Sequence, residues 1–358
     1  MKNPKHLGEW PRRLLLLLGG LFLLEAAIWL GVLDEYWTLT LVSICINVIL
    51  AVSLNLINGF TGQFSLGHAG FMAVGGYTAA VMGLKIMPSL IKAGIIPTWE
   101  NLTVRLGFLP PMSFPLAKAL FPGGVVLLSS TLLGGLLAAL MGFLIGLPTL
   151  RLRGDYLAIA TLGFGEIIRL SILNVEYLGG ATGLPNIPQY TTVAASFVFA
   201  AFTVILLGNL IRSTHGRAMM AIREDEIAAE AMGINTTRYK VTAFTIGAFF
   251  AGVAGALYAH TYYVVNPRCF SFMKTIDVLI MVVLGGQGSM IGAITGAIAI
   301  TVLNAFLGDL PMLRMIVYAL SLVTLMIFLP RGLLTVGDLL RLRFGAKEGG
   351  RLDAPHHG

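Results

Sequence analysis

The run WTLTLVSICINVILAVSLNLI, from Trp37 to Ile57, holds 21 residues without a single charge. A helix of this length reaches about 30 Å, which is the thickness of the hydrocarbon core of a bilayer. The whole chain has the same character, with 56% hydrophobic residues, 11% charged residues and a mean hydropathy of +0.85. Soluble domains carry about 25% charged residues. The sequence therefore predicts an integral membrane protein.

Nine further apolar runs accompany this one. They are 14–33, 67–86, 123–147, 156–175, 192–211, 241–263, 270–284, 290–308 and 312–329. No soluble module or low-complexity linker divides them, so residues 14–330 are predicted to form one transmembrane domain. The expected fold class is all-α, a polytopic transmembrane helical bundle of about ten helices. For the first run a cleaved signal peptide is the alternative, but no clear small-x-small cleavage site follows its leucines, and we favour an uncleaved helix.

Basic residues flank the first and last runs. They are Lys2, Lys5, Arg12 and Arg13 on one side and Arg331, Arg341, Arg343, Lys347 and Arg351 on the other. Because basic flanks tend to stay in the cytoplasm, the N-terminus (1–13) and the tail (331–358) are predicted to be cytoplasmic. Ten crossings then place 212–240 inside and 176–190 outside. The outside loop 85–118 departs from the rule, since it carries four basic residues and one acid.

Composition and motifs disfavour several classes of function. The net charge of +7 arises mostly in short flanks of apolar runs, so no nucleic acid partner is expected. Cys45 and Cys269 offer neither a disulfide framework nor metal-ligand spacing. No lysine follows a glycine, which excludes a P-loop, and neither His-Glu-x-x-His nor Cys-x-x-Cys occurs. We expect a non-enzymatic chain without cofactor or metal, which would receive any energy of ATP from another polypeptide.

A charged island, Arg212 to Lys240, holds nine charged residues between two apolar runs. Within it, an acidic triplet at 224–226 opens a pattern with apolar residues at i, i+4 spacing, and Gly233 follows. Acids suit the first turn of a helix, and a glycine before an apolar residue suits a left-handed C-terminal cap. A short helix is therefore predicted. Such a short helix is only marginally stable alone in water, so we expect it to pack either against its own bundle or against a soluble partner.

A polar, glycine-rich run, Asn55 to Gly70, separates two of the apolar runs. Irregular backbone at membrane depth persists only when it is buried in protein or lines a wet cavity. An ordinary cytoplasmic turn explains the run equally well. A weaker echo of its Gly-Gln-x-Ser pattern occurs at 286–289, and internal repeats are frequent in transporters.

Several ionisable residues lie in or near apolar runs, where they are costly and usually face a bundle interior or a cavity. They are Glu25, His68, Glu166, Arg169, His260, Lys274 and Asp277. Glu166 and Arg169 are three apart, as are Lys274 and Asp277, so each couple can pair on one helix face. We expect Lys274 and His260, which lie near run ends, to snorkel or to cap. The first couple indicates a cavity, a subunit contact or a purely structural pair.

Three stretches resemble the permeases of branched-chain amino acid ABC importers. The run NGFTGQFSLGHAG (58–70), continued by GYTAA (76–80), is similar to the signature of that family. The island from GRA (216–218) through IRE (222–224) to AAEAMGI (228–234) is similar to its cytoplasmic loop, and GGQGS (285–289) adds a third match. The resemblance covers most of residues 47–332. Length and the basic N-terminus are closest to the LivM-type subunit.

The resemblance implies a permease subunit that carries leucine, isoleucine or valine across the bacterial inner membrane. It also implies a heterodimer with a second permease subunit, two cytoplasmic ATPase subunits that bind ATP and Mg²⁺, and an extracytoplasmic substrate-binding protein. The residues assigned to ATPase coupling are Arg223, Glu224, Asp225, Glu226, Ala228, Ala229, Glu230 and Gly233. Those assigned to the translocation pathway are Gly62, Gln63, Ser65, His68, Glu166 and Gln287. The family's loop usually reads Glu-Ala-Ala-x-x-x-Gly, and Ile227 stands where its acid belongs.

The solute is predicted from apolar residues beside the glycine-rich run, Phe64, Phe71, Met72 and Val74. A wall of this kind suits a branched aliphatic side chain, whereas urea would lose its water contacts without replacement. Three alternatives stay open. They are a urea or short-amide ABC permease, an ATP-independent channel or ion-coupled carrier that uses Glu166, Arg169 and Asp277, and a membrane enzyme with His68 as base.

Overall fold

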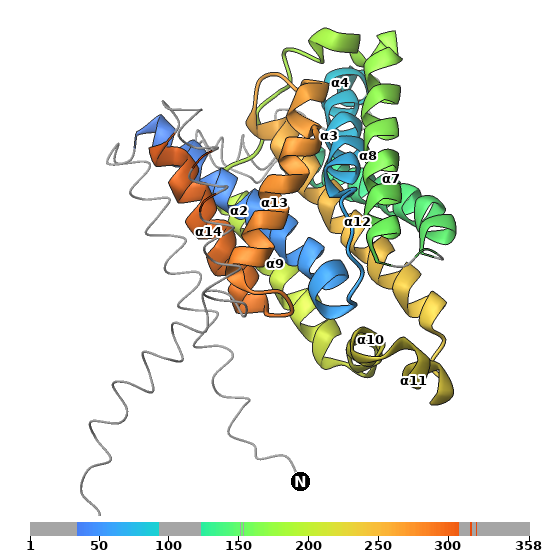
Figure 1. The fold of residues 1–358 in the computed structure, drawn as a ribbon. Coiled ribbons are helices and arrows are strands. Elements are labelled where there is room, and N and C mark those ends of the chain that lie inside the picture. The colour runs from blue at the N-terminus through green and yellow to red at the C-terminus, as the bar shows by residue number, and fades with distance from the viewer. Residues whose placement is uncertain are drawn as a thin grey trace, which may run out of the picture.

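A computed structural model describes residues 34–92, 123–150, 152 and 154–307, together with 316 and 320 (Figure 1). Within these residues the regular structure is helical, apart from one isolated antiparallel bridge between Leu184 and Val265. The all-α prediction is confirmed for this part of the chain. The predicted first and last spans, 14–33 and 312–329, fall outside the described residues except at 316 and 320.

The helices follow the predicted apolar runs closely. The α-helices are α2 (Glu35–Asn55), α3 (His68–Val81), α4 (Met87–Lys92), α7 (Val125–Thr149), α8 (Asp155–Asn174), α9 (Val193–Arg212), α10 (Thr214–Glu224), α11 (Glu226–Ala231), α12 (Thr236–Thr261), α13 (Phe272–Gly285) and α14 (Met290–Phe306). The π-helical turns are η2 (Leu56–Phe60) and η3 (Met82–Ile86), and the 3₁₀ turns are η5 (Glu176–Leu178), η6 (Gly180–Thr182) and η7 (Pro267–Phe270). Six helical stretches of the described residues are long and apolar enough to cross a membrane, 35–60, 68–90, 125–149, 155–174, 193–212 and 236–261. The protein is a multi-pass membrane protein.

Helix α12 forms the centre of the bundle and packs against α2, α3 and α7 (Figure 1). Glycines make this packing close, because apolar burial does not drive helices together in lipid and small residues let backbones approach. A Cβ at Gly252 of α12 would lie 2.6 Å from the carbonyl oxygen of Gly134 on α7, and one at Gly75 of α3 would overlap the backbone of Gly252. These glycines thus bring α3, α7 and α12 into backbone contact.

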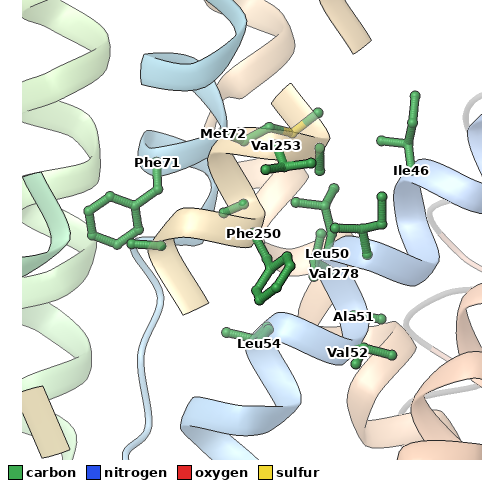
Figure 2. Close-up of a cluster of buried hydrophobic side chains, with 14 of the residues drawn as sticks. Ile46, Leu50, Ala51, Val52, Leu54, Phe71, Met72, Phe250, Val253 and Val278 are labelled. Carbon is green, nitrogen blue, oxygen red and sulfur yellow. The ribbon is translucent and has the colours of Figure 1, made fainter. Parts of the chain in front are cut away.

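The hydrophobic core lies between α2 and α12. Figure 2 shows Leu50 and Leu54 of α2 beside Phe250 and Val253 of α12, and all four side chains are buried. Phe71 of α3 packs edge to face on Phe244, with ring centroids 5.4 Å apart. Helices α8 and α9 differ from this core, because only 22% and 28% of the residues in their most apolar stretches are buried. They form the rim of the described bundle.

Two short helices, α10 and α11, form one end of the bundle, below the end of α2 in Figure 1. Only the second of them is predicted from the sequence. Helix α10 begins where the Ser213 side chain accepts a hydrogen bond from the Gly216 amide, 3.3 Å away. Its buried face consists of residues three apart, Gly216, Met219 and Ile222. We call this the α10–α11 end, and the end that carries η5, η6 and η7 the opposite end.

Candidate functional site

Helix α11 is capped at both ends, and the glycine cap at its C-terminus was predicted. The Asp225 carboxylate accepts hydrogen bonds from the amides of Ile227 and Ala228, at 2.9 and 3.0 Å. Gly233 has a φ of +81°, and the amide of Ile234 donates to the carbonyl of Ala229 at 3.1 Å. This is the six-to-one bond of a glycine-terminated helix. The acidic start and the glycine stop predicted for this helix are therefore confirmed.

The acidic face of α11 points toward α12. Glu226 Oε1 lies 2.6 Å from Lys240 Nζ, and Glu230 Oε1 accepts a hydrogen bond from the Thr236 hydroxyl at 2.7 Å. The two acids are four residues apart on α11, and their two partners are four residues apart on α12. Ala229 lies between the two acids and is buried. These contacts hold α11 against the first turns of α12, so its orientation is set by the bundle itself.

The opposite face of α11 is apolar and exposed. Ile227 is 72% exposed and Met232 82%, and Ala228 and Ala231 between them are also exposed. An apolar patch outside the membrane-spanning helices is typical of a site that a protein partner covers. Glu224 at its edge is exposed as well.

Arg223, the penultimate residue of α10, contacts η2, and its side chain is 37% exposed. Its Nη1 donates a hydrogen bond to the carbonyl oxygen of Gly59 in η2, at 2.9 Å. Its Nε donates to Glu224 at 3.1 Å, and its Nη2 pairs with the same carboxylate. The island and the glycine-rich run, which are remote in the sequence, therefore meet at this guanidinium.

The loop with the echo motif reaches the same place. The Asn55 side chain accepts a hydrogen bond from the Gly288 amide and donates one to the Ser289 carbonyl, each at 2.9 Å. Gly59 packs directly on the Gly288 backbone. The two Gly-Gln-x-Ser stretches, 62–65 and 286–289, thus lie at one end of the bundle. Asn55 is absent from the predicted site residues. An asparagine at the border of an apolar run is a sequence signal that could have pointed to it.

Most of the glycine-rich run is buried in the protein, although Gly62 and Phe64 within it are exposed. Asn58 Oδ1 accepts a hydrogen bond from the Ser65 amide at 3.1 Å, and the Leu66 amide donates to the Thr161 hydroxyl of α8 at 3.0 Å. A Cβ at Gly67 would lie 2.6 Å from the Thr161 carbonyl oxygen. Close backbone contact with α8 therefore accounts for a glycine here.

The six predicted pathway residues fall into two groups. Gln63, Ser65 and His68 are buried, whereas Gly62 and Gln287 are exposed and Glu166 is half-buried. His68 Nε2 lies 2.9 Å from the Ser53 hydroxyl. Its Nδ1 and both amide atoms of Gln63 have no hydrogen-bond partner among the described residues. Buried polar groups of this kind are rare in folded proteins, and they are costly unless water or another conformation satisfies them.

Helix α8 carries the predicted couple Glu166–Arg169 as an ion pair. Arg169 Nε donates to Glu166 Oε2 at 2.7 Å, and both side chains are partly exposed. They are the twelfth and fifteenth of the helix's 20 residues, which is the depth of the bilayer core in a helix about 30 Å long. Within the described residues, no cluster that could ligate a metal ion occurs.

Two other predictions about ionisable residues are wrong. Lys274 and His260 do not snorkel or cap but point into the bundle. Lys274 Nζ donates to Asn47 Oδ1 on α2 at 3.0 Å, and Asn47 donates in turn to the Thr301 hydroxyl of α14 at 2.9 Å. His260 is fully buried. Position near the end of an apolar run did not reveal these inward partners, because they lie on other helices.

An apolar groove of about 750 Å³ runs between α3, α7 and α8. Its lining includes Val74, one of the four side chains proposed for the solute wall, together with Tyr77 and Ile168. Phe71 and Met72 do not line it, because both are buried in the core. For these two residues the cavity wall stays a prediction.

Comparison with known proteins identifies the family. The profile described as "Branched-chain amino acid transport system / permease component" matches residues 37–329. The chain is 35% identical over 340 residues to the high-affinity branched-chain amino acid transport system permease protein LivM of Escherichia coli, an alignment that covers 85% of this chain and 71% of the relative. It is 26% identical to a probable LivM of Methanocaldococcus jannaschii, over 72% of this chain and 77% of the relative.

A second type of relative is similar across the same region. The permease protein LivH of Salmonella typhimurium is 28% identical over 261 residues, covering 72% of this chain and 80% of the relative. No solved structure matches. The chain belongs to the branched-chain amino acid transport permease family and is a LivM-like, non-catalytic permease component of such an ABC transport system.

Proposed function

We propose that this permease works in the bacterial inner membrane beside a second permease subunit, with two cytoplasmic ATPase subunits and an extracytoplasmic substrate-binding protein. Two observations support the assembly. The relatives include both LivM and LivH permeases, and this sequence contains no P-loop. ATP and Mg²⁺ would then bind only to the partner ATPases. Ten crossings with both termini in the cytoplasm complete the proposal, and a reporter fused after residue 358 tests the position of the tail.

The exposed apolar face of α11 is the observation that carries the ATPase contact. Its two acids are already engaged by α12, so Ile227, Ala228, Ala231 and Met232 are the side chains that α11 offers to a partner. Replacing Ile227 and Met232 with glutamate should prevent ATPase subunits from co-purifying with the permease. Thr237→Glu, an exposed substitution at the start of α12, is the matched control. Normal co-purification with the double variant would overturn the contact.

The solute passage, in this proposal, runs along the glycine-rich run and α8. Glu166 and Arg169 lie at membrane depth on the most exposed span, and charged side chains there rarely face lipid. One face of α8 also places Leu162 and Leu170 four residues before and after Glu166. A zwitterionic amino acid with a branched aliphatic side chain is complementary to this arrangement, because it carries both charges and an apolar group. Glu166 would meet the ammonium group and Arg169 the carboxylate.

Competition in reconstituted uptake tests the solute. Excess leucine should suppress transport of labelled valine, whereas excess urea should leave it unchanged. Glu166→Gln should weaken uptake of leucine about fivefold, by loss of an ion pair with the ammonium group. Suppression by urea and not by leucine would favour the urea or amide alternative.

A further inference from the structure

Two segments that are remote in sequence from Arg223, residues 59–62 and the turn at Gly288, contact its side chain. Gly59 accepts its Nη1 hydrogen bond at 2.9 Å, Gly62 lies against its aliphatic stem, and Gly288 lies against Nη1. Gly59 lies in η2, the π-helical turn that directly follows α2, and Gly288 lies in the turn between α13 and α14. The side chain therefore reaches from α10 to two parts of the bundle that do not adjoin it in sequence.

Gly59, Gly62 and Gly288, which we call the Arg223 socket, are positions that favour glycine. A Cβ at Gly62 would lie 2.8 Å from Arg223 Cγ, and one at Gly288 would lie 2.7 Å from Nη1. Both positions have positive φ, +73° and +79°, which disfavours other residues independently of space. A Cβ at Gly59 would overlap both Asn55 and Gly288. The three glycines thus leave a space that is filled by the arginine.

The socket adjoins the proposed ATPase contact directly. Arg223 and Glu224 end α10, Asp225 caps α11, and α11 carries the exposed apolar face. A displacement of α11 by a partner therefore acts on Arg223 through two intervening residues. At the other side of the socket, η2 is a π-helical turn, a rare conformation that is frequent at functional sites.

We propose that Arg223 is a positioning residue that transmits the motion of α10 and α11 to the end of α2 and to the α13–α14 turn. This inference rests on the proposed ATPase contact. Its guanidinium donates to the Gly59 carbonyl with one nitrogen while two others hold Glu224, a division that a planar fork allows and a lysine ammonium does not reproduce. When α10 shifts, the glycine-rich loop and the Gly288 loop shift with it.

The test uses the complete complex, reconstituted in vesicles with its binding protein. Arg223→Ala and Arg223→Lys are compared with Arg217→Ala, which removes an exposed arginine from the same helix. The measured quantities are ATPase co-purification, melting temperature, and the number of ATP molecules hydrolysed per leucine transported. We expect both Arg223 variants to retain the ATPase subunits and to melt near the wild-type temperature. Their ATP-to-leucine ratio should rise about tenfold for alanine and less for lysine, while Arg217→Ala stays at the wild-type ratio.

Two results would overturn the inference. An unchanged ratio would show that the contact transmits nothing. Loss of assembly with a lowered melting temperature would assign Arg223 to the stability of the fold. Failure of the ATPase contact is seen separately, because the Ile227 and Met232 double variant reports it by co-purification alone.

Discussion

Each end of the bundle contains a buried histidine, and the two imidazole rings differ in their hydrogen-bond partners. At the opposite end, His260 has a partner for both ring nitrogens, the Ser130 hydroxyl and the Pro188 carbonyl oxygen, each at 3.0 Å. At the α10–α11 end, His68 has a side-chain partner only at Nε2, and Gln63 beside it has none among the described residues.

Satisfied polar networks rigidify a structure, whereas partly satisfied ones permit other arrangements. His260 joins α12, α7 and the segment before α9 in one arrangement. The α10–α11 end instead combines glycine contacts, a π-helical turn and unpaired polar atoms. From this difference we expect the opposite end to stay fixed during transport and conformational change to be concentrated at the α10–α11 end.

The largest effect is expected from Gly59→Ala. The added methyl group would overlap the Asn55 side chain and the Gly288 backbone, so it separates η2 from the 286–289 loop. Overpacking of this kind costs about 1–3 kcal/mol. We expect leucine uptake to fall more than tenfold. Gly163→Ala is the control, because a Cβ there meets no described atom within 4 Å and the residue is also helical. Equal uptake by the two variants would contradict a tightly packed switch at this end.

A smaller loss is expected from Gly62→Ala. Alanine at a φ of +73° costs about 1–2 kcal/mol, and its methyl group also presses on Arg223. Gly154→Ala provides a matched comparison, since Gly154 has a φ of +56° and open space around it. Both variants should lose similar stability in thermal melts, but only Gly62→Ala should reduce uptake per assembled complex, by about tenfold. If Gly154→Ala reduces uptake equally, backbone strain alone explains the effect.

The third prediction concerns the opposite end. His260→Ala leaves the Ser130 hydroxyl and the Pro188 carbonyl without their partner, which should cost about 2 kcal/mol of stability. The melting temperature should fall by several degrees. Uptake per assembled complex should stay near the wild-type value. Ser129→Ala is the control, because its hydroxyl bonds only to its own helix at Val126. A selective loss of uptake with normal melting would show that this end also moves.

Much of this architecture follows from local sequence. Apolar runs predicted the helices, and acids before a glycine predicted α11 with its C-terminal cap, because each signal lies within a few residues of its effect. Helix α10 was missed because its buried stripe is only Gly216, Met219 and Ile222 amid polar residues. The inward partners of Lys274 and the meeting of Asn55, Arg223 and Gly288 are contacts between remote segments, so no local pattern encodes them.

The smallest effect is expected from Ser53→Ala, which removes the side-chain partner of His68. One neutral hydrogen bond contributes about 1 kcal/mol, so the melting temperature should change by only a few degrees. Ser196→Ala is the control, because Ser196 is equally buried and bonds only to its own helix at Thr192. If the α10–α11 end changes arrangement during transport, Ser53→Ala should alter leucine uptake about twofold while Ser196→Ala leaves it unchanged. Identical uptake by both variants would mean that His68, like His260, belongs to the fixed part of the bundle.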